Sequence, residues 1–284
     1  MRLSKKYFVA LIISLLALFL IMKRPRHPDT LNVAAAAASS EWGMNPTWDD
    51  GLAEVAKYQA RRTVYGKTRV FETICITVKE DFTPNFYVKA DSPSDQSIPV
   101  LKFNVVSTIP AGNYDYRYLT SVFVSRHNPM NLIKLTSGSQ EWCGNTFKEV
   151  RNWENKSGLI FHSYFDGEGD GSLTLDLRPG DLMEDQLPVA LRSLAFKEGH
   201  QFRTRVLDSL IDNRAKPPRL SSAEIAVRGR EKLNDWNVWR VEVRREGLLQ
   251  TYWFEQAFPN ILVKCVSSDG RELLLKERTR WKYW

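Results

Sequence analysis

Apolar and polar residues alternate along most of the chain after residue 53, and a period of two predicts β-strands rather than helices. In residues 67–82, four aliphatic side chains share one face of the predicted strand: Val70, Ile74, Ile76 and Val78. Short turn sequences such as Glu246-Gly247 separate consecutive segments, so neighbouring strands are expected to pair as hairpins. The pattern predicts roughly a dozen strands in an antiparallel sheet, because no helices lie between successive strands.

One segment has helical spacing instead. In residues 182–196, Leu187, Leu191 and Leu194 recur on one face, and Pro188 suits the first turn of a helix that begins near Asp185. One or two helices are too few to cover the apolar face of such a sheet. We therefore expect a mainly β fold in which strong curvature, as in a half-barrel, lets the antiparallel sheet cover much of itself.

The inner face of such a sheet would carry aromatic and aliphatic side chains. Tyr116, Tyr118 and Val122 share one face of the predicted strand at 114–124. Together with Trp142, they are candidates for lining a groove that accepts a lipidic or other hydrophobic ligand. A sandwich core filled by its own side chains fits the same pattern, so the alternation leaves both arrangements open.

The N-terminus has the pattern of an export signal. Basic residues precede an uninterrupted apolar run at 7–22, and a second basic stretch follows it. Small residues typical of a cleavage site come only at 34–40, after the charged stretch, which favours an uncleaved signal anchor at 1–24 over a cleaved signal peptide. We expect this helix to hold the protein in the inner membrane, with the body exported to the periplasmic side.

The remaining chain divides into a linker and a body. Residues 25–50 contain prolines and a run of alanines without alternation, and are predicted to be a linker. Residues 51–284 are predicted to form the exported antiparallel β domain, with a candidate internal break near 212–222, where two prolines adjoin.

The distribution of net charge along the chain argues against one class of partner, nucleic acid. The net charge of the chain is +7, but residues 1–40 hold six cations and one anion, which leaves +2 for the remaining 244 residues, 41–284. Proteins that bind nucleic acid usually carry a basic excess across the whole domain. We therefore expect no nucleic-acid partner.

The three cysteines leave several chemistries open. Cys75, Cys143 and Cys265 can supply one disulfide and one thiol in an exported body, or serve as small buried apolar residues. Cys143 follows Glu141 and Trp142, and a histidine such as His162 on a neighbouring strand would complete a thiol nucleophile. The same segment also suits the end of a strand with a buried thiol.

An acidic turn resembles the first half of a calcium loop. Asp166, Glu168 and Asp170 alternate with glycines, as oxygen ligands around a hard cation do. The twelfth position of the loop is Leu177, where a bidentate Glu is required, and the flanking segments are predicted strands. We expect a hairpin turn rather than a metal site, and no motif for a cofactor occurs elsewhere in the chain.

Three blocks of sequence carry a family resemblance: residues 55–72, residues 136–147 (TSGSQEWCGNTF) and residues 251–281. They resemble a family of exported bacterial proteins near domain of unknown function 3108. Such domains are similar in turn to the curved half-barrel of periplasmic lipoprotein carriers. The resemblance implies a fold whose concave face can shelter an acyl chain, and it implies no particular cargo.

Three functions follow from these observations, in order of preference. The first is a non-catalytic binding or carrier module of the cell envelope with a hydrophobic ligand. The second is an envelope structural or assembly factor that binds a protein partner through its sheet. The third is a thiol-dependent hydrolase centred on Cys143 and His162.

Overall fold

The computed structural model describes residues 37–153 and 156–284. The predicted signal anchor or signal peptide, and the part of the predicted linker before residue 37, lie outside the described residues. Among the helices that are described, none has the length and hydropathy of a membrane-spanning segment.

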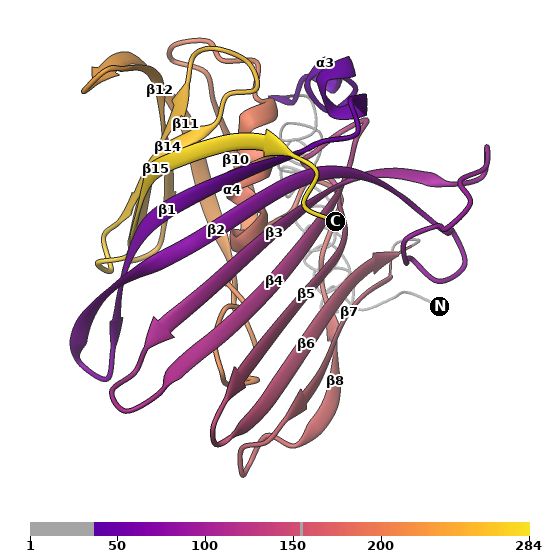
Figure 1. The fold of residues 1–284 in the computed structure, drawn as a ribbon, viewed down its shortest axis with the longest axis vertical. Coiled ribbons are helices and arrows are strands. Elements are labelled where there is room, and N and C mark those ends of the chain that lie inside the picture. The colour runs from indigo at the N-terminus through magenta and orange to yellow at the C-terminus, as the bar shows by residue number, and fades with distance from the viewer. Residues whose placement is uncertain (1–36, 154–155) are drawn as a thin grey trace, which may run out of the picture. The chain divides into compact units, whose positions relative to one another are not determined.

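The body is mainly β, as predicted, and in the described residues its fifteen strands form one sheet (Figure 1). The first eight strands are β1 (Ala53–Val64), β2 (Lys67–Phe82), β3 (Ile98–Pro110), β4 (Asp115–Ser125), β5 (Leu132–Glu141), β6 (Gly144–Trp153), β7 (Lys156–Ser163) and β8 (Asp170–Leu175). The other seven are β9 (Leu182–Met183), β10 (Gln201–Leu207), β11 (Leu220–Leu233), β12 (Trp236–Arg245), β13 (Leu248–Glu255), β14 (Leu262–Ser267) and β15 (Glu272–Trp281).

Strands that follow each other in the chain are hydrogen-bonded neighbours in the sheet, except β8 and β9. β1 pairs with β15 and so joins the two halves, which leaves β8 and β9 as the two edges of an unclosed sheet. All pairs are antiparallel except the short pairing of β9 with β10. The chain passes from one edge to the other within residues 176–181, so the end of β8 and the start of β9 are at most about 25 Å apart.

Irregular pairing helps this sheet to curve. The register shifts at Lys57/Tyr58 in β1, at Phe123/Val124 in β4, at Val227/Gly229 in β11 and at Trp253/Phe254 in β13. Each shift of this kind bends a strand and increases its local twist. The predicted curved antiparallel sheet is therefore confirmed.

The concave side of the sheet encloses a short helical segment. Residues 184–193 form η3 (Glu184–Gln186), α4 (Leu187–Ala190) and η4 (Leu191–Ser193), and α4 lies between the two halves of the sheet (Figure 1). Leu187, Val189 and Leu191 are completely buried in the main core. This segment replaces the longer helix predicted at 182–196. It ends early because Ser193 and Ala195 form backbone hydrogen bonds with residues 37–39 instead of continuing the helix.

A cap that belongs to the predicted linker closes one end of the core. Residues 37–50 contain α3 (Ser40–Gly43) and η2 (Pro46–Asp49), which bury the rings of Trp42 and Trp48 against each other. The guanidinium of Arg192 lies over both rings. It also forms a buried bidentate ion pair with Glu54 of β1, in which Nη1 and Nη2 donate to the two carboxylate oxygens at 2.7 and 2.8 Å. Residues 37–50 are therefore packed into the body.

The predicted internal break coincides with a long loop on the concave side. Residues 208–219 connect β10 to β11, and their backbone carbonyls accept hydrogen bonds from inward-facing side chains of β1, β5 and β6. We call residues 208–215, which make these contacts, the strap. The break in the sequence pattern thus marks a loop that crosses the sheet.

Candidate ligand cavity

A cavity of about 530 Å³ lies on the concave side of the sheet. Its walls come from three parts of the fold: β1–β3, the strands β12–β15 with their turns, and η3 with α4 and the start of the strap. Small-molecule sites usually measure about 300–1,000 Å³. The cavity is thus large enough for a small ligand.

The position of the cavity follows from the inner rows of the sheet. One row of paired residues runs from Cys75 on β2 through Val105 and Thr120 to Ser137 and Lys148 on β6. The row therefore changes from apolar at β2 and β3 to polar at β4–β6. The strap covers the polar part with its carbonyl groups, and the apolar part faces the cavity.

The strap is held by groups that would otherwise be buried without partners. Ser137 Oγ donates to the carbonyl of Leu210 at 3.1 Å, and Lys148 Nζ donates to the carbonyls of Asp212 and Arg214 at 2.7 Å each. Burial lowers the pKa of Lys148 to about 8, with Asp212 opposing this effect. These bonds fix one wall of the cavity.

The inner part of the cavity is apolar. Phe103, Tyr252 and Cys75 line it and are at least nine-tenths buried, and Leu273 adds a partly buried aliphatic side chain. Burial raises the pKa of the Cys75 and Cys265 thiols to about 12 each, so both stay protonated and weakly nucleophilic at neutral pH. All three cysteines are free, and no disulfide joins them.

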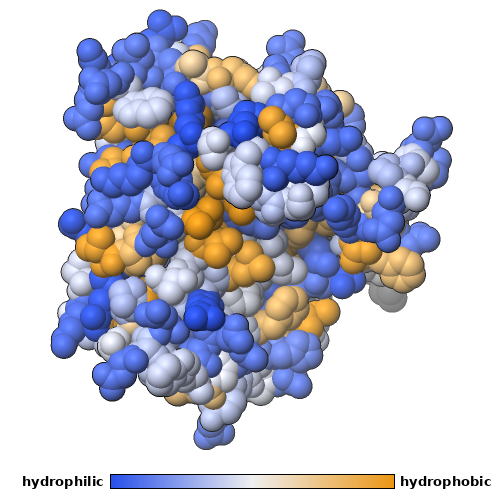
Figure 2. Space-filling view, in the orientation of Figure 1, coloured by the Kyte–Doolittle hydropathy of each residue, from blue (hydrophilic) through white to orange (hydrophobic). Residues whose placement is uncertain are grey.

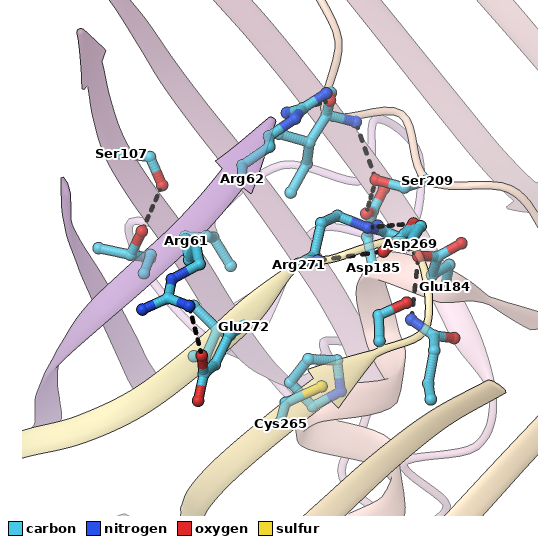
Figure 3. Close-up of a pocket in the computed structure, with 18 of the residues that line it drawn as sticks. Arg61, Arg62, Ser107, Glu184, Asp185, Ser209, Cys265, Asp269, Arg271 and Glu272 are labelled. Atoms are coloured by element: carbon cyan, nitrogen blue, oxygen red, sulfur yellow. Dashed lines mark hydrogen bonds and ion pairs between the residues drawn. The ribbon is translucent and has the colours of Figure 1, made fainter. Parts of the chain in front are cut away.

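One side of the cavity is charged, as Figure 3 shows with Arg271 between Asp269 and Glu184. Glu184 is buried and is bound by Arg271 at 2.6 Å, by Arg245 and by the amide of Gln250 at 3.1 Å. Burial opposes the charge of Arg271, but Glu184 and Asp269 outweigh it and raise its pKa. The negative charge of Glu184 is therefore balanced by the two arginines, although the carboxylate lies in the interior.

Asp185 lies beside this cluster and forms no ion pair with another described residue. It is 6% exposed, and burial raises its pKa to about 6 although two hydrogen bonds oppose this. The donors are Ser209 Oγ at 2.5 Å and the backbone N–H of Leu210 at 2.7 Å. Asp185 thus joins η3 to the strap.

Three buried polar atoms of the cavity residues have no hydrogen-bond partner in the described structure: Gln250 Oε1, Arg245 Nε and Ser267 Oγ. All three residues are more than nine-tenths buried. A buried polar atom normally forms a hydrogen bond, so an unpaired one in a cavity wall indicates a place for a ligand or a water molecule.

The groove residues named from the sequence lie elsewhere. Tyr116, Tyr118 and Val122 do face inward and are buried at 5%, 5% and 0% exposure, but they lie under the strap side of the sheet and do not line the large cavity. Tyr116 and Tyr118 line a separate, smaller space of about 120 Å³. Trp142 is 81% exposed in the β5–β6 turn and stacks on Tyr114.

The structure does not bring the candidate thiol and imidazole together. Cys143 is exposed, and its Sγ lies 3.5 Å from the hydroxyl of Tyr114. His162 faces outward on β7 with its Nδ1 3.2 Å from Asp170. Glu141 accepts hydrogen bonds from Asn213 of the strap and from Tyr114. Cys143 and Glu141 therefore share Tyr114 as a partner, whereas His162 has a different partner, Asp170.

The carboxylates of the acidic turn also point to different partners. Glu168 accepts hydrogen bonds from Ser163, at 2.5 Å, and from the backbone N–H of Ala215, at 2.9 Å, whereas Asp170 contacts His162. Asp166 is exposed. Within the described residues, no group of three or more metal-ligating side chains converges.

Sequence reasoning missed the charged residues of the cavity. Arg245 and Gln250 occupy positions in β12 and β13 whose neighbours two residues away, Val243 and Tyr252, are buried apolar residues. A charged or amide side chain at an inward position of an alternating strand was the available signal.

Comparison of the chain with family models, curated proteins and solved structures finds no match in any of the three.

Proposed function

We propose that this protein is a non-catalytic binding or carrier module, and that the cavity beside β1–β3 holds the apolar part of a small hydrophobic ligand. The observation that supports this most strongly is the cavity of about 530 Å³ between an apolar inner wall and a charged side. About ten buried methylenes would contribute ~8 kcal/mol before ordering costs, which suffices for useful affinity. The half-barrel likeness of the sequence and the expected export to the cell envelope agree with such a role.

The structure offers a matched pair of variants to test this function. Val105 lines the cavity from β3, whereas the next residue, Val106, faces outward on the same strand. Val105→Trp should fill the cavity, and Val106→Trp should leave it open. The probe is a decane derivative that carries a photoreactive diazirine, added to the full chain in a non-ionic detergent, with the labelled peptides mapped by mass spectrometry.

We expect saturable labelling of peptides that contain cavity residues such as Leu273, the loss of most of this labelling in Val105→Trp, and its retention in Val106→Trp. Labelling that never saturates, or that is the same in both variants, would contradict the proposed function. Circular dichroism of both variants checks that each one is folded.

A second candidate function, the binding of a protein partner in the envelope, has one supporting observation. A row of directly paired outward residues crosses the sheet from Ile74 through Val106, Leu119 and Gly138 to Phe147. Leu119 and Phe147 are 50% and 41% exposed, and apolar surface gathers in the middle of this face (Figure 2). Exposed apolar surface of this kind often marks an interaction site.

A further inference from the structure

The groups around the cavity also restrict the polar end of its ligand, an inference that rests on the proposed function. Four arginines line the cavity against six carboxylates, which gives a net charge of −2 when all are ionised. The arginines are Arg61, Arg62, Arg245 and Arg271, and the carboxylates are Glu184, Asp185, Asp208, Asp212, Asp269 and Glu272. The electrostatic potential of such a site repels an anion.

The arginines are also already engaged. Arg271 binds Glu184 and Asp269, and Arg245 binds Glu184 and Asp208. Of the remaining two, Arg62 donates to the carbonyl of Ile211 at 3.0 Å, and Arg61 lies 3.9 Å from Glu272. An anionic head group would therefore have to compete with a carboxylate or a carbonyl for each guanidinium.

The unpaired acceptor of Gln250 favours a ligand whose polar head donates a hydrogen bond. Gln250 is 4% exposed, and its Nε2 is fixed by Glu184, so its Oε1 stays as a buried acceptor in the cavity wall. A ligand that donates an N–H or O–H at this place would satisfy the acceptor. Gln250 contacts Glu184 of the charged side and lies two residues from Tyr252 of the apolar wall, on the same strand.

We infer that the cavity selects amphiphiles whose polar head donates hydrogen bonds and carries no negative charge, such as an alkylammonium or a long-chain alcohol. Fatty-acid carboxylates of the same length are poor ligands of this site. The apolar wall accepts the chain, and Gln250 with the excess of carboxylates selects the head.

Competition against the photoreactive decane probe tests this on the full chain at neutral pH. Dodecylamine and dodecanol should each displace the probe from the cavity peptides at concentrations on the order of tenfold lower than dodecanoate. Equal or stronger displacement by dodecanoate would overturn the inference while leaving the proposed function intact. Failure of the probe itself to label the cavity saturably would overturn both.

A charge-matched pair of double variants separates electrostatic selection from general effects. Asp208→Asn with Asp269→Asn removes two negative charges beside the cavity, whereas Asp91→Asn with Asp95→Asn removes two from an exposed loop outside it. The double variant at Asp208 and Asp269 should reduce the preference for dodecylamine over dodecanoate to less than about threefold. The double variant at Asp91 and Asp95 should preserve this preference. An unchanged preference for dodecylamine in the Asp208 and Asp269 double variant would contradict the electrostatic basis of the inference.

Discussion

Single residues that interrupt the alternation carry most of the chemistry of this molecule. Gln250, Arg245 and Lys148 all occupy inward positions where an apolar residue is the rule. Their strands could be predicted, because alternation is a local property of the sequence. Their partners could not, because Glu184 and the strap come from segments far away along the chain.

Asp185 should make stability depend on pH between its unfolded and folded pKa values. The folded state binds this proton more tightly, so the contribution of Asp185 is full below about pH 4 and declines as the pH rises to about 6. A shift of roughly two pKa units corresponds to on the order of 3 kcal/mol. Asp185→Asn keeps one acceptor for Leu210 and one donor for Ser209.

Urea unfolding at pH 4.5 and pH 7 measures this contribution. Relative to wild type, Asp185→Asn should gain stability at pH 7 and show a smaller loss between the two pH values. An unchanged difference between the two pH values in the variant would show that Asp185 does not titrate in this window.

The buried pair Arg192–Glu54 is a second residue-scale test. Glu54→Gln leaves the guanidinium, which is 2% exposed, without its charged partner, and such a loss typically costs about 3–5 kcal/mol. Glu277→Gln is the control, because its pair with Lys57 is exposed and should contribute at most about 1 kcal/mol. Urea midpoints of the two variants compare these effects, and equal midpoints would contradict the structural role assigned to Arg192.

At the scale of elements, the strands were easier to predict than the segments on the concave side. Turn residues such as Gly66 and Gly247 mark hairpins whose partners are close in sequence, and both adopt the positive φ that such turns require. The helix predicted at 182–196 is three short helical pieces over residues 184–193, and it ends early because the backbone groups of Ser193 and Ala195 bond to residues 37–39. The strap has no periodic pattern, so its course depends on tertiary contacts alone.

The strap should loosen when its buried lysine is removed. Lys148→Met leaves the carbonyls of Asp212 and Arg214 without their donor, and each unsatisfied group costs about 1–3 kcal/mol. We expect faster amide hydrogen exchange in residues 208–215, with little change in β12 and β13. Lys102→Met is the control on the same sheet, because its partner Glu80 lies outside the strap. Equal exchange of residues 208–215 in the two variants would exclude the assigned role of Lys148.

At the scale of the whole molecule, the unclosed sheet curves around both α4 and the cavity (Figure 1). The curvature could be expected from the shortage of helix, and the sheet confirms it. The place of the cavity could not be expected, because it depends on the pairing of β1 with β15 across more than 200 residues. Tyr116, Tyr118 and Val122 share the predicted inner face, but which part of that face stays uncovered is decided by the strap.

The most direct measurement of the central claim is native mass spectrometry of the full chain released gently from its detergent micelle. The account predicts a one-to-one adduct of a small amphiphile in the wild type and in Val106→Trp, and its absence in Val105→Trp, which fills the cavity. An adduct that is equally abundant in both variants, or a wild-type protein that carries none even after incubation with dodecylamine, would contradict the account.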